Sequence, residues 1–173
     1  MKTSLEYLTI RVFYGERKAE RSQVPLMNHI DEGLTILDTI DASKDAKKAY
    51  CIHPIVQSDT ELIANFDCLP SFSPRVLALA MEYRSVANEF LSGKIGLGLT
   101  PDQIRLSPLQ EVNDMLIADK VQNRKDFLRY HMGTHTRAFE LDYYFQLWLD
   151  RLGITEDVYF GLCLEIDNNK LEK

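Results

Sequence analysis

The segment SPLQEVNDMLIADKVQNRKDFLRY, residues 107–130, decides the fold class of this chain. Its apolar residues recur at helical spacing and predict one buried helix face, formed by Val112, Met115, Leu116 and Val121. Ser107 with Gln110 has the pattern of a capping box, and Pro108 stands at the first helical position. We therefore expect a long amphipathic helix that begins at Ser107 and ends near Gly133.

Asp119 and Asn123 stand one turn apart in this helix, so a carboxylate and an amide share one face. A carboxylate next to the apolar stripe must be ion-paired, hydrogen-bonded or bound to metal, because burying it alone costs several kcal/mol. The alternative is a partly exposed aspartate at the edge of the stripe. The helix by itself leaves both interpretations open.

The remainder of the chain carries the same helical periodicity. Further helices are expected over residues 4–17, 25–40, 43–53, 59–66, 74–92, 135–152 and 155–166. The glycine-rich residues 93–106 lack the ending of a phosphate-binding loop and are expected to form a surface connection. Because no segment alternates like a strand, the chain is predicted to be all-α, with residues 1–173 as one domain.

Pro54 follows His53 at the end of one predicted helix. Proline has no N–H for a bond to the preceding turn, so we expect the helix to kink or stop near His53. Asp59 then has the position of an N-cap for the next short helix.

The composition is that of a soluble globular protein, with 45% hydrophobic and 27% charged residues. The net charge of −6 argues against a nucleic-acid partner. No apolar run approaches the roughly 18 residues of a membrane span, and the N-terminus lacks the apolar core of a signal peptide. We expect a cytoplasmic protein without membrane contact, in which Cys51, Cys68 and Cys163 are thiols rather than disulfides or zinc ligands.

Several polar residues have both a structural and a functional interpretation. His29 lies beside an apolar stripe, where a histidine is more often a hydrogen-bonded core residue than a ligand. His131 and His135 flank Gly133, which places a helix break between them and favours a turn over a metal site. The charged residues 16–21 suit a solvated face, although arginines beside a pocket also bind phosphate in a bidentate manner.

Three segments, in this order, resemble the hydrolase domain of RelA/SpoT enzymes, including its small stand-alone metazoan form. Residues 21–37, RSQVPLMNHIDEGLTIL, resemble the family run (K/R)SGxPYxxHP, and residues 46–62, AKKAYCIHPIVQSDTEL, resemble A-x-LLHDxxED. The third segment, IADKVQNRKDF at residues 117–127, is similar to xADKLxNLRDL. Tyr144-Phe145 resembles the family's YF pair. That domain belongs to the HD superfamily of metal-dependent phosphohydrolases.

The resemblance implies an HD-type helical bundle in which the ligands of one metal ion converge from separate helices. It places these ligands at His29, His53 and Asp119. For a mixed set of histidines and a carboxylate, Mn²⁺ is the divalent ion we expect. The resemblance, with nearby basic residues standing in for a missing one, also implies a set of substrate-binding residues: Arg17, Lys18, Arg21, Asn123 and Tyr144.

This chain departs from the family pattern at positions that carry the chemistry. It has His53-Pro54 where the family has His-Asp, and Gln57-Ser58 where the family has the Glu-Asp pair that handles the attacking water. Loss of the aspartate removes negative charge from the metal site. Gln57 cannot replace a general base, because a neutral amide does not titrate in the useful range.

Two carboxylates are available to take over the lost acidic roles. Glu32 lies one turn from His29, and Asp59 follows shortly after Pro54. We expect Glu32 and Asp59 to act as catalytic carboxylates or to complete the metal shell, unless the metal ion alone activates water.

We therefore expect an enzyme: a metal-dependent phosphohydrolase or pyrophosphohydrolase acting on a nucleotide such as a guanosine tetraphosphate-like alarmone, or on another small phosphorylated substrate. The alternative is a catalytically degenerate HD-like module that senses a nucleotide or binds a partner. The retained histidines and aspartate favour the enzyme, whereas the missing acids favour the binding module. The sequence leaves a homo-oligomer open, with the exposed part of the helix between Ser73 and Leu91 as one candidate contact.

Overall fold

The computed structural model describes residues 1–92 and 98–171, and within these ranges it contains helices and no β-strand. The α-helices are α1 (Leu5–Tyr14), α2 (Met27–Thr39), α3 (Lys44–Val56), α4 (Asp59–Ala64), α5 (Pro74–Glu89), α6 (Gln110–Tyr130), α7 (Ala138–Arg151) and α8 (Glu156–Leu171). Two 3₁₀ segments, η1 (Phe66–Ser71) and η2 (Pro101–Gln103), lie in the connections. The all-α prediction is confirmed.

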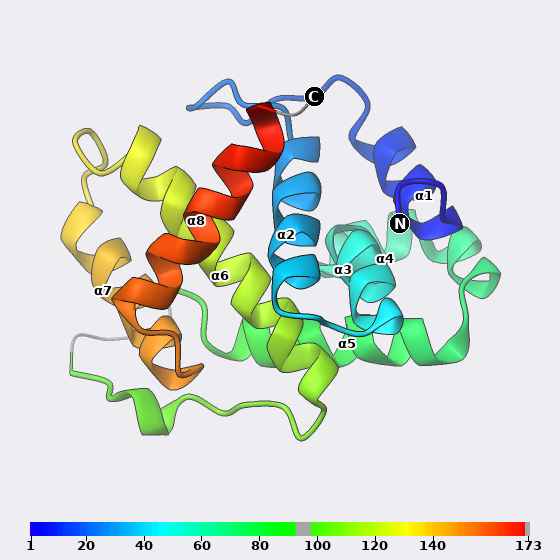
Figure 1. Cartoon of the computed structure of the whole chain (residues 1–173). Helices are drawn as coiled ribbons and strands as arrows, with labels where there is room; N and C mark the ends of the chain where they lie inside the picture. The colour runs from blue at the N-terminus through cyan, green and yellow to red at the C-terminus, as the bar shows by residue number, and fades with distance from the viewer. Residues whose placement is uncertain (93–97, 172–173) are drawn as a thin grey trace.

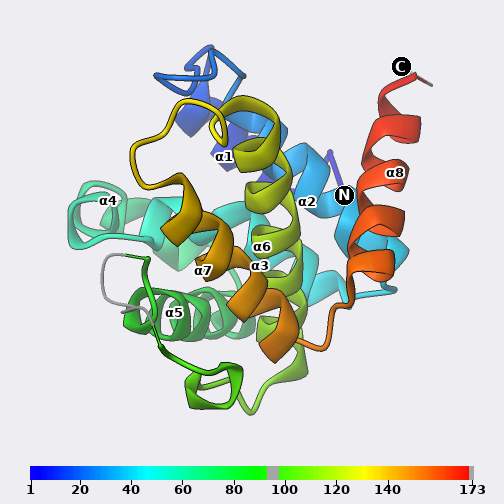
Figure 2. The ribbon, with the colours of Figure 1, turned by 90° about the vertical axis from the view of Figure 1, so that its left-hand side faces the viewer.

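Helix α6 occupies the middle of the bundle. It packs against α2, α3, α5, α7 and α8, and both ribbon views show it running between them (Figure 1 and Figure 2). Helix α3 packs against α1 and α5, while α8 lies against α2 on the outside. Helices from distant parts of the sequence therefore meet around α6 and α3.

One hydrophobic core fills the space between these helices. Its largest fully buried side chains include Trp148 of α7, Tyr50 of α3 and Tyr159 of α8. The apolar face predicted for α6 is buried as expected. The same helix also buries a series of polar and charged side chains: Asp119, Lys120, Gln122, Arg124 and Lys125. Buried polar groups need partners, and the partners of this series define the functional side of α6.

The capping box predicted at Ser107 is wrong. Helix α6 begins at Gln110, and Leu109 stands at its N-cap without a side-chain hydrogen bond. The Ser107 hydroxyl instead accepts from the Leu109 N–H (3.2 Å) and donates to Glu82 of α5 (3.0 Å), and Asn113 hydrogen-bonds to the Ser107 backbone N–H and carbonyl. A contact across the bundle and a local side-chain bond thus replace the cap.

A kink or an end of the helix was predicted near His53. Helix α3 does not end there but continues through Pro54 to Val56. Because Pro54 has no N–H, the Tyr50 carbonyl four residues earlier loses its helical donor. The His53 ring takes that place, since its Nδ1 atom lies 2.6 Å from the Tyr50 carbonyl oxygen. The proline is accommodated because a histidine side chain satisfies the acceptor that it leaves free.

Other boundaries differ from the predictions by smaller amounts. The N-cap of α4 is Ser58, whose hydroxyl accepts from the Glu61 N–H (3.3 Å), and Asp59 is the first helical residue. Helix α8 runs past residue 166 to Leu171, where the neighbouring Lys170 forms an ion pair with Glu32 of α2. Residues 93–97 of the glycine-rich connection lie outside the described residues.

Gly33 of α2 allows Tyr50 of α3 to pack directly on the helix backbone. A Cβ atom at Gly33 would lie 2.2 Å from the Tyr50 hydroxyl oxygen, far inside van der Waals contact. Tyr50 is fully buried, so its ring has little room to move aside. We predict that Gly33→Ala lowers the free energy of unfolding by about 3 kcal/mol, the upper end of common overpacking penalties, in urea denaturation.

Gly161 of α8 provides the matched control for this prediction. It is exposed, and an added Cβ would meet nothing within 4 Å. Gly161→Ala should therefore raise the free energy of unfolding by about 0.5–1 kcal/mol through helix propensity. Equal stability of Gly33→Ala and wild type would show that α2 and α3 can separate at that point without penalty.

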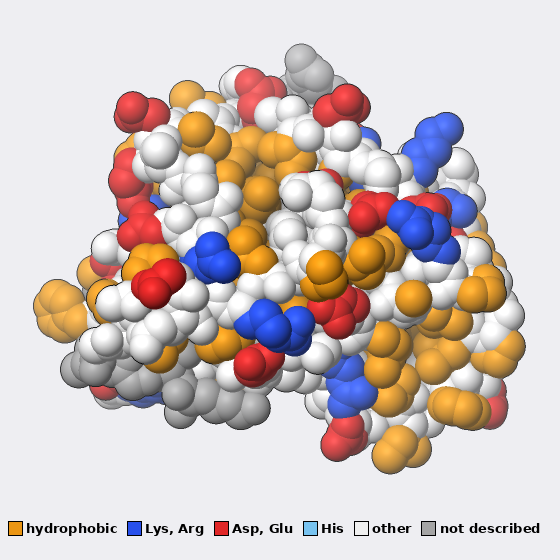
Figure 3. All heavy atoms as spheres, turned by 90° about the horizontal axis from the view of Figure 1, so that it is seen from below, with side chains coloured by type: hydrophobic (Ala, Val, Ile, Leu, Met, Phe, Trp, Pro, Cys, Tyr) orange, Lys and Arg blue, Asp and Glu red, His pale blue; other side chains and the backbone are white. Residues whose placement is uncertain are grey.

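Within the described ranges, no helix combines the length and the apolarity that crossing a membrane requires. Figure 3 shows the face seen from below the view of Figure 1, where visible basic side chains form separate groups among acidic and hydrophobic ones. On this face the pattern differs from the continuous basic stripe typical of proteins that bind nucleic acids.

Candidate metal centre

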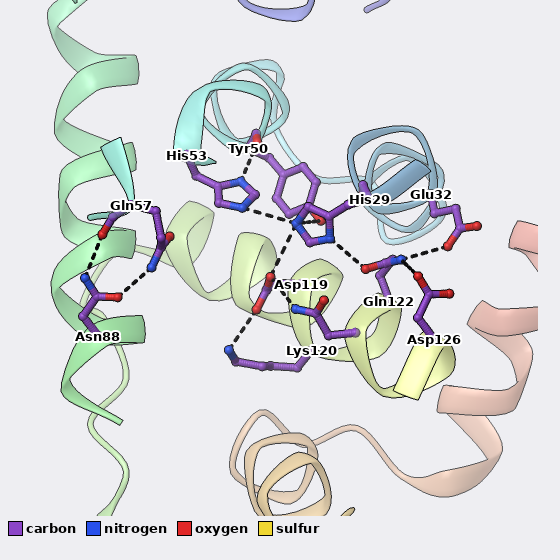
Figure 4. Close-up of polar contacts among 11 residues, drawn as sticks. His29, Glu32, Tyr50, His53, Gln57, Asn88, Asp119, Lys120, Gln122 and Asp126 are labelled. Carbon is purple, nitrogen blue, oxygen red and sulfur yellow. Dashed lines mark hydrogen bonds and ion pairs between the residues drawn. The ribbon is translucent and has the colours of Figure 1, made fainter. Parts of the chain in front are cut away.

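His29 of α2, His53 of α3 and Asp119 of α6 meet at one point between their helices (Figure 4). The Nε2 atom of His29 lies 3.3 Å from Nε2 of His53 and 3.6 Å from Oδ1 of Asp119. One candidate ligand atom from each residue lies within 4.8 Å of the other two. Asp119 is 5% exposed, so it is a buried residue with polar partners and not one at the edge of the apolar stripe.

The proton position on His53 follows from its neighbours. A carbonyl oxygen can only accept, so the contact with the Tyr50 carbonyl requires a proton on His53 Nδ1. Burial, assisted by the neighbouring His29, lowers the pKa of His53 to about 3, and the ring is neutral at physiological pH. The Nε2 atom of His53 therefore carries a lone pair on the side of His29.

Gln122 of α6 fixes the proton position on His29. The Nδ1 atom of His29 lies 2.7 Å from Gln122 Oε1, and the Gln122 amide nitrogen donates to Glu32 (3.1 Å) and Asp126 (2.7 Å). Since ionised carboxylates only accept, the amide nitrogen must point at them and the amide oxygen at His29. His29 then carries its proton on Nδ1 and a lone pair on Nε2.

Two imidazole lone pairs consequently point at one another across 3.3 Å, with no proton between them. The Tyr50 hydroxyl lies 3.3 Å from both His29 Nε2 and the His29 carbonyl oxygen, and its single proton can serve only one of these atoms. Nitrogen ligands about 2.1 Å from one ion lie about 3.0–3.5 Å apart, which matches the spacing of the two rings. The donor set therefore fits a divalent cation held by two imidazoles and one carboxylate.

A fixed cation already balances the Asp119 carboxylate. Lys120 Nζ lies 2.8 Å from Asp119 Oδ2, and Asn123 donates to Oδ1 at 2.8 Å. Burial alone would raise the pKa of Asp119, but the Lys120 ammonium, and the two histidines where they are protonated, outweigh it and bring the pKa to about 2. The carboxylate is thus ionised, and a bound metal ion would share it with Lys120.

Removing the Lys120 charge should have opposite effects on the metal-free and metal-bound protein. Lys120→Met leaves Asp119 buried without its cation, which should lower the stability of the metal-free protein by about 3 kcal/mol. Mn²⁺ should then stabilise the variant more than it stabilises wild type, because no lysine competes for the carboxylate. Thermal melts with and without Mn²⁺ measure both effects.

Lys47→Met is the control, because Lys47 pairs with the exposed Asp38 of α2 (2.7 Å), away from the three candidate ligands. Mn²⁺ should stabilise this variant to the same extent as wild type. An equal or smaller Mn²⁺ effect on Lys120→Met than on wild type would contradict a competition between lysine and metal for Asp119.

A cavity of about 810 Å³ opens beside the three candidate ligands. Its volume lies within the range of about 300–1,000 Å³ that is typical of small-molecule sites. His29, His53 and Asp119 form part of its wall. The wall also carries basic and aromatic side chains, namely Arg17, Arg21, Lys120, His131, His135, Tyr14, Tyr83 and Tyr144, together with the carboxylates of Glu61 and Asp126.

Four of the five predicted substrate-binding residues line this cavity, namely Arg17, Arg21, Asn123 and Tyr144. The fifth, Lys18, is exposed outside it and forms an isolated backbone bridge with Pro25. The turn predicted for residues 131–135 is confirmed, and both of its histidines lie on the cavity wall.

The two predicted catalytic carboxylates do not line the cavity. Glu32 is buried behind the site, where it forms ion pairs with Lys125 (3.0 Å) and Lys170 (2.6 Å). Asp59 is exposed and pairs with Arg84. The position of Glu32 on α2 directs its side chain toward Lys125 of α6 and Lys170 of α8. Because α4 begins at Asp59 and not after it, the Asp59 side chain lies near Arg84 of α5.

Several residues of the site carry no obvious sequence signal. Lys120 and Gln122 lie beside the apolar stripe of α6, and nothing in the spacing shows that they are buried and paired. Pro54 is different, because its missing N–H and the preceding histidine are both readable from the sequence. The pairing of His53 with the freed Tyr50 carbonyl could have been anticipated on that basis.

In comparisons of this chain with known proteins, no protein-family model matches it, and neither does any curated protein or solved structure.

Proposed function

We propose that His29, His53 and Asp119 bind one divalent cation, with Mn²⁺ as the expected ion. The observation that carries this proposal is the contact between two imidazole Nε2 atoms beside a buried carboxylate, with the proton of each ring placed on Nδ1 by its neighbour. The Tyr50 hydroxyl is then a donor for one of these two acceptors at most, and a cation between them would satisfy both.

We further propose that the chain is a phosphohydrolase or pyrophosphohydrolase of the HD type, acting on a nucleotide such as a guanosine tetraphosphate-like alarmone. The cavity beside the ligands supports this, because Arg17 and Arg21 line it and form no ion pair with a carboxylate within the described residues. Arg17 lies over Phe13 and Tyr14 and donates to backbone carbonyls, which orients its guanidinium. Arginines held in this way suit phosphate groups.

The residues of the cavity can be given roles in this reaction. When bound, a divalent cation supplies Lewis-acid chemistry, polarising a phosphoryl group and making water more acidic. Asn123 holds the Asp119 carboxylate in place, and Tyr144 offers an aromatic surface on the cavity wall. Glu61 of α4 lines the cavity and has no ion pair within the described residues, so we assign it the role of proton acceptor that Gln57 cannot fill.

A binding module without hydrolysis is the second candidate, and Gln57 favours it. Gln57 lines the cavity at the position where the resembled family has an acid. Its amide nitrogen donates to Asn88 (2.6 Å), and its Oε1 atom is buried without a hydrogen-bond partner within the described residues. A free acceptor of this kind suits recognition of a ligand N–H or O–H group better than water activation.

Metal content and turnover together distinguish these functions. Elemental analysis of the purified protein should show about one divalent ion per chain, and Mn²⁺ should support release of phosphate or pyrophosphate from one member of a nucleotide panel. Thermal stabilisation by a nucleotide without turnover would favour the binding module. Absence of metal, turnover and stabilisation would contradict both.

The three cysteines are free thiols, which supports a proposed location in the reducing cytoplasm.

A further inference from the structure

Gln122 is the buried polar residue of α6 with the most constrained surroundings. Its side chain is 1% exposed. Its amide makes three hydrogen bonds, one through the oxygen and two through the nitrogen. The amide oxygen accepts from His29, while the amide nitrogen donates to Glu32 and Asp126 (Figure 4). A flipped amide would place its oxygen against two carboxylates, so only one orientation is favourable.

The orientation of Gln122 decides which nitrogen of His29 carries the proton. With an acceptor at Nδ1, the proton stays on Nδ1 and Nε2 keeps its lone pair. Without that acceptor, the proton can move to Nε2, where it would donate to His53 Nε2 at 3.3 Å. Such a hydrogen bond between the two rings would occupy both lone pairs and close the site to a cation.

The carboxylates behind Gln122 are themselves held by lysines. Glu32 accepts from Lys125 of α6 (3.0 Å) and Lys170 of α8 (2.6 Å), and Lys125 also contacts Asp126 at 2.7 Å. Burial acts to raise the pKa of Glu32, but Lys170 and Lys125 outweigh it and lower that pKa, so the Glu32 carboxylate stays ionised. Both acceptors of the Gln122 amide nitrogen therefore remain available.

We propose that Gln122 and Glu32 form a positioning relay that keeps His29 in the tautomer able to bind a cation. The relay rests on the proposed metal site and adds to it the residues that prepare one ligand. It also gives Glu32 a role that explains its burial and its place outside the cavity. Groups that hydrogen-bond to metal-ligating histidines typically change metal affinity by about 10–100-fold when they are removed.

The test compares Gln122→Leu with wild type in the absence and presence of metal. Nitrogen-15 NMR of the metal-free proteins in mildly alkaline buffer should show His29 protonated on Nδ1 in wild type and mainly on Nε2 in Gln122→Leu. Calorimetric titration with Mn²⁺ should show a 10–100-fold loss of affinity in the variant. Gln122→Glu keeps an acceptor at His29 Nδ1 and should retain the wild-type tautomer, but its second oxygen faces Glu32 and Asp126 and should lower the stability of the variant.

Gln110→Leu is the matched control, because Gln110 donates to Asp114 one turn further along the same helix (2.8 Å) and touches no histidine. It should leave the His29 tautomer and the metal affinity unchanged. If Gln122→Leu does not fold, the less disruptive Gln122→Met replaces it. A folded variant that retains the proton on Nδ1 would overturn the relay.

The two readouts separate failure of the relay from failure of the proposed function. If wild type binds no divalent cation but the tautomer changes as expected, the relay stands and the metal site falls. If wild type binds the cation and the Gln122 variants bind it equally well with an unchanged tautomer, the metal site stands and the relay falls.

Discussion

Asp119→Asn is expected to abolish stoichiometric Mn²⁺ binding and, with it, any metal-dependent turnover. Asp119 supplies the one negative charge among the three candidate ligands, and the adjacent Lys120 would then repel a cation without compensation. Loss of a group that merely supports a metal ligand costs about 10–100-fold in affinity, so loss of the ligand itself should cost more than about 100-fold. Calorimetric titration and a phosphate-release assay measure the two effects.

Asp114→Asn is the control for this prediction. Asp114 lies on the same helix and accepts from Gln110, away from the candidate ligands. The control should bind Mn²⁺ as wild type does. Retention of a stoichiometric, tightly bound ion by a folded Asp119→Asn variant would mean that the ion lies elsewhere.

Glu32→Gln is expected to produce the largest loss of stability among single isosteric changes at the site. The Glu32 carboxylate is 4% exposed and lies between Lys125 and Lys170, so its neutralisation leaves buried positive charge with less compensation. Breaking a buried ion pair in this way costs about 3–5 kcal/mol, and we expect about 3 kcal/mol because Asp126 still pairs with Lys125. Urea denaturation near neutral pH measures it.

The same residue predicts how stability depends on pH. Burial tends to raise the pKa of Glu32, but Lys170 and Lys125 lower it below the ordinary value of a glutamate in the folded state. A lowered folded pKa means that the stabilisation is complete above the unfolded pKa and is lost as the pH falls through the folded one. Wild type should therefore lose its advantage over Glu32→Gln as the pH falls below about 4.5.

Glu89→Gln is the exposed counterpart, since Glu89 pairs with Arg105 at the surface (2.9 Å). Its effect should stay within about 1 kcal/mol, as is usual for surface ion pairs. A Glu32→Gln effect as small as that of Glu89→Gln, with no change as the pH falls, would show that neither Lys125 nor Lys170 depends on Glu32.

The helix starts that could be predicted accurately from the sequence are those whose capping side chain bonds to the backbone of its own helix. Ser43 and Ser73 accept hydrogen bonds from backbone N–H groups three residues on, and Pro74 opens α5 as expected. Ser107 shows the limit of such signals, because its hydroxyl accepts from the Leu109 N–H and donates to Glu82, from a distant part of the chain, while α6 begins only at Gln110. Local patterns do not reveal which distant group will hydrogen-bond to a side chain at a helix start.

The candidate site could be anticipated only in part, and for a related reason. The resemblance placed His29, His53 and Asp119 together, and these three do converge. It did not show which way the remaining carboxylates turn, because the face that Glu32 presents depends on the packing of α8, a helix that lies outside the resembling segments. Ion pairs between helices that are distant in the sequence follow no periodic pattern, so a single sequence does not reveal them.

Anomalous diffraction from crystals grown with Mn²⁺ tests the central claim most directly. We predict one strong anomalous peak bonded to Nε2 of His29, Nε2 of His53 and a carboxylate oxygen of Asp119. A well-ordered structure at saturating Mn²⁺ with no peak at that point, and with the two imidazoles in direct hydrogen-bond contact, would contradict the account.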